Sequence, residues 1–272
     1  MNYHSDKWVM EQINKHNDFA HTLYDPSLIV GVFCQGSTNY GLDTPNSDID
    51  TKCIVLPSFK NICLAQKPVS TTHVLDNNEH LDAKDIRSYV MCFRKQNLNF
   101  LEILFTPYAV INPMYEEQWK RLMDNRERIA RMNEFRAVKS MKGIALEKFH
   151  AMKHKYPTKL DIIEKYGYDG KQVHHLLRVD DYLTRYIAGE DYESCLHPTG
   201  DLVSRLMDYK RLSVIPLAEA EEEAEKVLAH TVAIADAFCA EREDQEDEEM
   251  RALLEDVSYS IMKISVEKEL QK

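Results

Sequence analysis

Residues 31–55 of the chain read GVFCQGSTNYGLDTPNSDIDTKCIV, and this stretch decides the fold. Apolar β-branched and aromatic residues at 28–34 predict a buried strand, and a similar run at 51–56 predicts its neighbour. The loop between them contains Gly41 and Pro45, two residue types that favour turns. We therefore expect two adjacent strands joined by a polar, turn-forming loop.

Two carboxylates, Asp48 and Asp50, stand where this loop enters the second strand. Residues i and i+2 of a strand point to the same face, so both acids are predicted on one face while Ile49 turns to the core. Like charges at that spacing repel unless a cation neutralises them. Hard oxygen ligands suit Mg²⁺, which also binds substrate phosphates. A solvated turn is the alternative for an isolated Asp-x-Asp, and the surrounding string argues against it.

The end of the first predicted strand carries a candidate phosphate-binding turn. Gly36 lets a phosphate approach the backbone closely, and Ser37 offers it a hydroxyl and an amide. Lys52, two residues beyond the carboxylate pair, is a further candidate for nucleotide binding. A phosphate cradle and a metal-binding pair are thus expected on adjacent strands.

These motifs resemble the signature of polymerase β-type nucleotidyltransferases, through Gly36-Ser37, Tyr40-Gly41 and Ser47-Asp48-x-Asp50. The longer string GSTNYGLDTPNSDIDTK is similar to a subgroup of predicted nucleotidyltransferases that includes the RNA-repair-pathway polymerase β-like family. Residues 97–105 resemble that subgroup's NPNxLExLF-type segment, and a Lys-x-x-His-x-x-x-Arg helix follows. The resemblance covers about residues 28–105 well and the helical remainder more loosely.

The resemblance implies a third carboxylate on a neighbouring strand, where it helps to hold metal and accepts the proton of the attacking hydroxyl. Residues 69–83 predict two further short strands with a turn between them. Asp82 is our choice, because it falls on the second of these strands and outside the turn. Asp85 is the second candidate, with capping of the next helix as its alternative role, and Glu79 is the third.

A later helix, predicted over 171–188, carries the Lys-His-Arg pattern of the resemblance. Lys171, His174 or His175, and Arg178 share one face at spacings of three, four and seven. Such a face suits the triphosphate of a nucleotide, whereas a packed core histidine is the usual role of a single His.

Residues 136–155 form a basic stretch in an otherwise acidic protein, with Glu147 as their single acid. A solvated helix face and a phosphate-contacting wall opposite the carboxylates are both open interpretations. The basic residues are Arg136, Lys139, Lys142, Lys148, Lys153 and Lys155.

The composition bounds the class of protein. The chain has 272 residues, 44% of them hydrophobic, which is enough for a substantial core in one or two domains. Its formal charge of -11 excludes general nucleic-acid binding by long-range attraction, so a nucleotide or RNA must meet a local basic patch. Six scattered Cys without a Cys-x-x-Cys pair argue for reduced thiols and against zinc. The N-terminus is polar and no apolar run approaches a membrane span, so we expect a soluble, cytoplasmic protein without membrane association.

We predict an α+β fold. Residues 1–106 are expected to form a nucleotidyltransferase domain with a small mixed β-sheet, and residues 107–272 an all-helical domain that closes the other side of a cleft.

The implied reaction is nucleotidyl transfer, in which a hydroxyl attacks the α-phosphate of a nucleoside triphosphate such as ATP and pyrophosphate leaves. Two Mg²⁺ (or Mn²⁺) ions about 3.5–4 Å apart would clamp the attacking and leaving oxygens, held by Asp48, Asp50 and Asp82. RNA is the acceptor that the RNA-repair resemblance suggests. AMP transfer to a protein is the alternative among enzymes, and an inactive nucleotide- or RNA-binding module is the alternative of another class. The intact Asp48–Asp50 pair speaks against the inactive module, while the acceptor, the nucleotide and the oligomeric state stay open.

Overall fold

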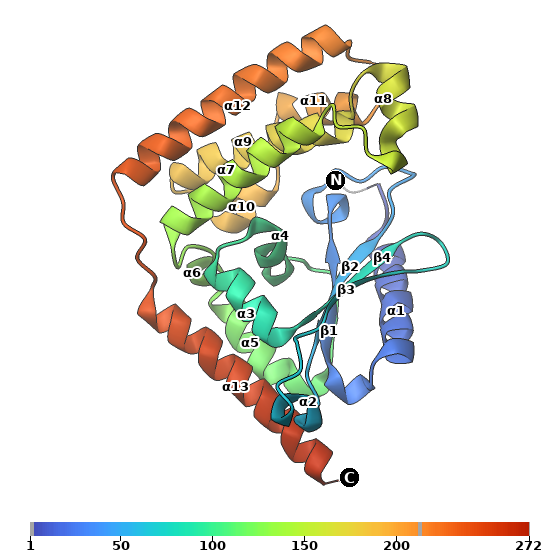
Figure 1. Cartoon of the computed structure of the whole chain (residues 1–272), viewed down its shortest axis with the longest axis vertical. Coiled ribbons are helices and arrows are strands. Elements are labelled where there is room, and N and C mark those ends of the chain that lie inside the picture. The colour runs from blue at the N-terminus through green and yellow to red at the C-terminus, as the bar shows by residue number, and fades with distance from the viewer. Residues whose placement is uncertain (1–2, 212–213, 272) are drawn as a thin grey trace. The chain divides into compact units, whose positions relative to one another are not determined.

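The computed structural model describes residues 3–211 and 214–271 (Figure 1). Contacts between residues divide the chain into two compact units, Met1–Met132 with Glu246–Lys272, and Asn133–Gln245. We call the first the sheet unit and the second the helical unit. The domain boundary predicted after residue 106 falls inside the sheet unit, and the C-terminal helix also belongs to this unit.

The sheet unit contains a mixed sheet with the order β3-β4-β2-β1-β5 among the described residues. β1 (Ile29–Gln35) and β2 (Asp50–Val55) pair antiparallel, whereas β2 and β4 (His80–Asp85) pair in parallel. β3 (Ser70–Val74) forms a hairpin with β4 at one edge, and β5 (Ala109–Ile111) pairs with β1 at the other. The predicted α+β class is confirmed; the short strand β5 was not predicted.

Helix α1 (Asp6–Leu23) covers one face of the sheet (Figure 1). Its first turn is capped by Ser5, whose side chain accepts a hydrogen bond from the Trp8 amide. Val9 and Ile13 are fully buried in a core that the inward-facing residues of the sheet complete. The strands and Ile49, which directly precedes β2, contribute Ile29, Val32, Cys34, Ile49, Cys53, Val55, Leu81 and Ala83 to this core. Alternation along each strand then directs Asp50, Lys52, His80 and Asp82 to the opposite face.

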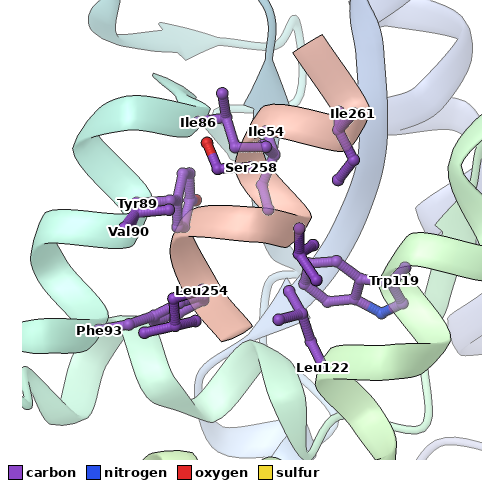
Figure 2. A pocket seen from close by; sticks show the side chains of 11 residues that line it. Ile54, Ile86, Tyr89, Val90, Phe93, Trp119, Leu122, Leu254, Ser258 and Ile261 are labelled. Atoms are coloured by element: carbon purple, nitrogen blue, oxygen red, sulfur yellow. The ribbon is translucent and has the colours of Figure 1, made fainter. Parts of the chain in front are cut away.

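Three helices pack beyond one end of that opposite face: α3 (Ile86–Arg94), α5 (Glu116–Asp124) and α13 (Glu248–Leu270). Figure 2 shows the apolar side chains that meet there, among them Ile54 of β2 and Trp119 of α5. The gap between them is only about 10 Å³, at the lower limit of what one water molecule needs, so it is a packing interface and not a ligand pocket. The C-terminal helix therefore completes the core of the sheet unit.

Other elements of the sheet unit are short. They include the helical turns at Pro26–Leu28, Ser37–Tyr40, Glu102–Leu104 and Pro113–Tyr115, with α2 (Phe59–Cys63), α4 (Leu98–Leu101) and α6 (Arg126–Ala130).

The helical unit is built on α7 (Glu134–Ala151), α9 (Gly170–Ile187) and α12 (Leu217–Ala240), which pack against one another. Its remaining elements are the turn Pro157–Lys159, α8 (Leu160–Tyr166), α10 (Tyr192–Leu196) and α11 (Asp201–Lys210). No helix in the described parts of the chain is both long and apolar enough to cross a membrane.

Candidate active site

The parallel pairing of β2 with β4 decides which predicted site residues meet. Lys52 lies directly opposite Asp82, and its Nζ is 3.6 Å from the Asp82 Oδ2. Asp50 precedes Lys52 by two residues and therefore shares this face with Asp82. The structure thus places Asp50, Lys52 and Asp82 together on the face that α1 does not cover.

Asp50 is held at the start of β2 by the first residue of β4. The His80 amide donates to the Asp50 Oδ1 at 2.8 Å, and the His80 Nδ1 lies 3.1 Å from the same oxygen. The Asp50 side chain stays 30% exposed, so solvent and ligands reach it. Asp48 lies in the loop before the strand and is exposed, while Ile49 is fully buried, as the alternation predicts.

The two other candidates for the third carboxylate are engaged elsewhere. Asp85 caps α3, because its Oδ1 accepts from the Arg87 amide at 2.8 Å, and its Oδ2 pairs with the Arg87 guanidinium at 2.7 Å. Glu79 is buried and lies on the α1 side, where its Oε1 accepts from the Ile49 amide. Asp82 is therefore the candidate that shares a face with Asp50.

Lys52 is a buried cation, only 5% exposed. Burial lowers the pKa of Lys52, and the neighbouring Asp82 opposes that shift. Its Nζ also lies 4.5 Å from the centre of the Phe100 ring in α4, a favourable cation–π distance. The segment 97–105, which carries part of the family resemblance, thus contributes an aromatic wall beside the Lys52–Asp82 pair.

Gly36 leaves room for a ligand at the end of β1. Its φ of 89° is a conformation that strongly favours glycine, and a Cβ at this position would meet nothing within 4 Å. Ser37 follows at the start of a short helical turn and is partly exposed. This geometry fits the predicted phosphate cradle.

Two buried polar residues that we did not predict hold this loop in place. Asn39 donates to the Cys34 carbonyl at 2.8 Å and accepts from the Thr106 hydroxyl at 2.7 Å. Asp43 accepts from the Tyr3 and His4 amides, both at 2.9 Å. The available signal was their residue type, since Asn and Asp bond readily to nearby backbone groups. Apart from Cys34, however, their partners lie 39 to 67 residues away in the sequence.

The Lys171-His174-Arg178 pattern lies on α9 of the helical unit. Lys171 is exposed, Arg178 is 7% exposed and His174 is 2% exposed. The His174 Nδ1 donates to the Leu206 carbonyl of α11 at 2.9 Å. Burial lowers the pKa of His174 to about 3, so the ring is neutral at pH 7 and offers a phosphate no positive charge.

The low pKa of His174 predicts that the free energy of unfolding decreases as the pH is lowered. The unfolded chain takes up this proton near pH 6.5 and the folded chain only near pH 3, so lower pH favours unfolding between these values. The free energy of unfolding should fall by up to about 1.4 kcal/mol for each pH unit in this window. Urea unfolding at pH 7 and pH 5 measures this loss. His174→Gln, which can still donate to Leu206, should show a smaller loss, and the remainder comes from groups such as His175, whose burial also lowers its pKa. An equal loss in the variant would contradict the assignment.

The basic stretch 136–155 is largely paired within the helical unit. Its cations meet acids on α12, on the segment that follows α12, or beside them on α7 itself. The pairs are Arg136–Asp244 at 2.7 Å, Lys142–Asp236 at 2.5 Å, Lys148–Glu147 at 2.8 Å and Lys153–Glu221 at 2.6 Å. These contacts favour the solvated-face interpretation for those four residues.

No three His, Cys, Asp or Glu side chains in residues 3–211 and 214–271 gather closely enough to hold a metal ion. Asp50 and Asp82 nevertheless fit a hard divalent cation by their chemistry, because both are partly exposed carboxylates on one face of adjacent strands. Asp50 accepts a hydrogen bond from the His80 amide, and Asp82 pairs with the Lys52 ammonium. A bound cation would take over the neutralisation of both carboxylates.

Comparison with known proteins identifies the family to which the chain belongs. The chain matches the RNA repair pathway DNA polymerase beta family over residues 9–179, which is more than half of its length and includes every predicted site residue. A search of curated proteins finds no match. Since the family match spans the Gly-Ser turn, the Asp-x-Asp strand and the start of the helical unit, the chain belongs to the RNA repair pathway DNA polymerase β family, a family of polymerase β-like nucleotidyltransferases.

Proposed function

We propose that the chain transfers a nucleoside monophosphate from a nucleoside triphosphate to a hydroxyl acceptor, using Mg²⁺ or Mn²⁺ at the face shared by β2 and β4. The main support is that Asp50 and Asp82 lie on adjacent parallel strands, and that the strand beside Asp50 ends in the open turn at Gly36. Gln35, the residue before that glycine, pairs with Asp50 across β1 and β2. The turn and the carboxylates therefore lie at the same end of the sheet.

Each residue near this end has a role that its chemistry supports. Gly36 and Ser37 would receive the outer phosphates through the backbone amides and the hydroxyl. Asp48, Asp50 and Asp82 would hold the divalent cation. When bound, the cation supplies positive charge to the phosphate oxygens.

The transfer itself is a displacement at phosphorus. The acceptor oxygen forms a bond to the α-phosphorus, the bond from that phosphorus to the bridging oxygen breaks, and pyrophosphate leaves. Asp82 would take the proton of the acceptor hydroxyl, since its carboxylate stays 23% exposed. The Lys52 ammonium beside it would stabilise the negative charge that builds on the phosphoryl oxygens.

RNA is the acceptor class that the family description favours. The test is incubation of the protein with each α-labelled nucleoside triphosphate, Mn²⁺ or Mg²⁺, and either RNA or total protein. Label on the 3′ end of RNA supports the proposal, whereas label on protein would assign the chain to protein nucleotidylation. If no label is transferred with any nucleotide or acceptor, the remaining interpretation is an inactive nucleotide- or RNA-binding module.

Lys171, the exposed member of the Lys-His-Arg pattern, is a separate candidate for nucleotide binding. It is exposed, and no carboxylate within the described residues pairs with its Nζ. Lys171→Glu should raise the nucleotide dissociation constant about fivefold and leave kcat nearly unchanged, because an exposed charge contributes similarly to ground-state and transition-state binding. Titration with a fluorescent nucleotide at two salt concentrations measures this effect. Lys165→Glu, an exposed residue on α8, is the control, and equal affinities for both variants and the native protein would exclude Lys171.

A further inference from the structure

A buried polar network lies directly behind the Asp-x-Asp motif, on the α1 side of the sheet. The Glu79 Oε1 accepts from the Ile49 amide at 3.0 Å, and its Oε2 accepts from the His16 Nε2 at 3.0 Å. The other ring nitrogen, His16 Nδ1, lies 2.8 Å from the Thr51 hydroxyl. His16 and Thr51 are fully buried and Glu79 is 8% exposed.

The network forms hydrogen bonds with Ile49 and Thr51, two alternate residues of the motif. Ile49 lies between Asp48 and Asp50, and Thr51 follows Asp50. Because side chains alternate along a strand, Ile49 and Thr51 face α1 while Asp50 faces the candidate site. Glu79 therefore fixes the peptide between the two acids from the face of the sheet opposite to Asp50.

His80, the residue after Glu79, bonds to the motif on the opposite face of the sheet. His80 follows Glu79 at the start of β4, and its amide donates to the Asp50 carboxylate at 2.8 Å. One dipeptide, Glu79-His80, thus holds the backbone before Asp50 and the Asp50 side chain. The parallel register of β2 with β4 brings this dipeptide beside the motif.

The oxygens of Glu79 are occupied, which separates its role from that of a metal ligand. Oε1 is bonded to Ile49, and Oε2 accepts from both His16 and Asn77, the latter at 2.6 Å. Burial acts to raise the pKa of Glu79, but the hydrogen bonds from His16, the Ile49 amide and Asn77 outweigh it and lower the pKa. Hydrogen bonds to such an ionised carboxylate are stronger than neutral ones, so they hold the Ile49 peptide firmly.

We propose that Glu79, together with His16 and Thr51, is a positioning residue that sets the orientation of the Asp48 and Asp50 carboxylates for metal binding. The inference rests on the proposed function, because it assigns these two acids to the metal. Its physical basis is that misplacing a reacting group by about 1 Å costs about 100-fold in rate. Without Glu79, the Ile49 amide loses its acceptor and the entry to β2 loses its anchor.

The test compares Glu79→Ala with Glu79→Gln. Ala should raise the dissociation constant of Mn²⁺ at least about tenfold and lower kcat about 100-fold, with KM for the nucleotide changed less than about threefold. Gln should stay within about threefold of the native protein in all three quantities, because its amide oxygen still accepts from Ile49, the bond that fixes the motif. Its amino group donates to His16 in the other tautomer, and only the bond from Asn77 is lost. Mn²⁺ binding is read directly by electron paramagnetic resonance with the metal alone.

Asn112→Ala is the matched control. It removes the two bonds that the Asn112 Nδ2 donates to the Pro26 and Ile29 carbonyls and the one that its Oδ1 accepts from the Met114 amide. These bonds lie at the end of β1 opposite the motif, so the substitution should leave Mn²⁺ binding unchanged. If Glu79→Ala does not fold, Thr51→Val replaces it, because the substitution is close to isosteric and removes only the hydroxyl that His16 contacts. Thr51→Val should raise the Mn²⁺ dissociation constant about threefold.

Hydrogen exchange of the Ile49 amide gives a readout that does not depend on the reaction. Exchange should become faster in Glu79→Ala and stay slow in Glu79→Gln. Native Mn²⁺ affinity in Glu79→Ala, or in Thr51→Val, would overturn the positioning role. Loss of Mn²⁺ binding in Glu79→Gln equal to that in Asp50→Asn would instead make Glu79 a ligand. If the native protein neither binds Mn²⁺ nor transfers a nucleotide, the proposed function fails and the inference falls with it.

Discussion

Asp50→Asn is expected to abolish nucleotidyl transfer, with a loss of kcat/KM on the order of 10³-fold or more. The substitution removes the negative charge that would hold the divalent cation, yet its amide oxygen still accepts a hydrogen bond from His80. Because the Asp50 side chain is 30% exposed and makes no buried ion pair, the free energy of unfolding should change by about 1 kcal/mol or less. Label transfer and thermal unfolding are measured on the same preparation.

Asp76→Asn is the control for this variant. Asp76 is an exposed acid in the turn between β3 and β4, close in sequence to the site but not on its face, and its substitution should affect neither quantity. Transfer by Asp50→Asn at the native rate would refute a metal-dependent reaction at this face.

Asp82→Asn and Asp85→Asn are expected to separate catalysis from stability. Asp82→Asn should lower kcat about 100- to 1,000-fold, because it removes the carboxylate that we propose both binds the metal and takes the acceptor proton. It also leaves the buried Lys52 without its carboxylate, at a cost of about 1–3 kcal/mol in the free energy of unfolding.

Asp85→Asn should behave in the opposite way. It weakens the cap of α3 and the buried contact with Arg87, so a loss of about 1–2 kcal/mol in stability is expected with kcat unchanged. Steady-state kinetics and urea unfolding of both variants decide whether Asp82 or Asp85 is the third carboxylate. An inactive Asp85→Asn protein beside an active Asp82→Asn protein would transfer the role of third carboxylate to Asp85.

Local patterns in the sequence were sufficient for the secondary structure around the site. The apolar runs predicted β1 and β2, and the turn at 76–78 correctly separated β3 from β4. Asp85 caps α3, the alternative role that we had kept open for it. Capping depends only on local structure, because the acid bonds to a free amide in the first turn of the helix. β5 escaped prediction, since three residues are too few to show an alternation.

The side chains that meet at the site were decided by tertiary structure. Nothing within either segment specifies that β2 and β4 pair in parallel with Lys52 opposite Asp82, and this register alone places Asp82 beside Lys52. Glu79 was interpreted from the sequence as a third choice of metal ligand. His16 of α1, a partner 63 residues away, instead binds its carboxylate on the other face of the sheet.

Charge pairing and the boundaries of the compact units also depended on tertiary structure and not on local sequence patterns. The sequence showed a basic stretch at 136–155, but its neutralisation depends on acids such as Glu221 and Asp236 that only the packing of α7 against α12 brings near. It placed the C-terminal helix with the helical part, whereas α13 packs on α3 and α5. Periodicity, capping and turn chemistry act over a few residues and are therefore readable from the sequence. Ion pairs, registers and helix partners are chosen by the burial of surfaces far apart along the chain, and only the folded structure reveals them.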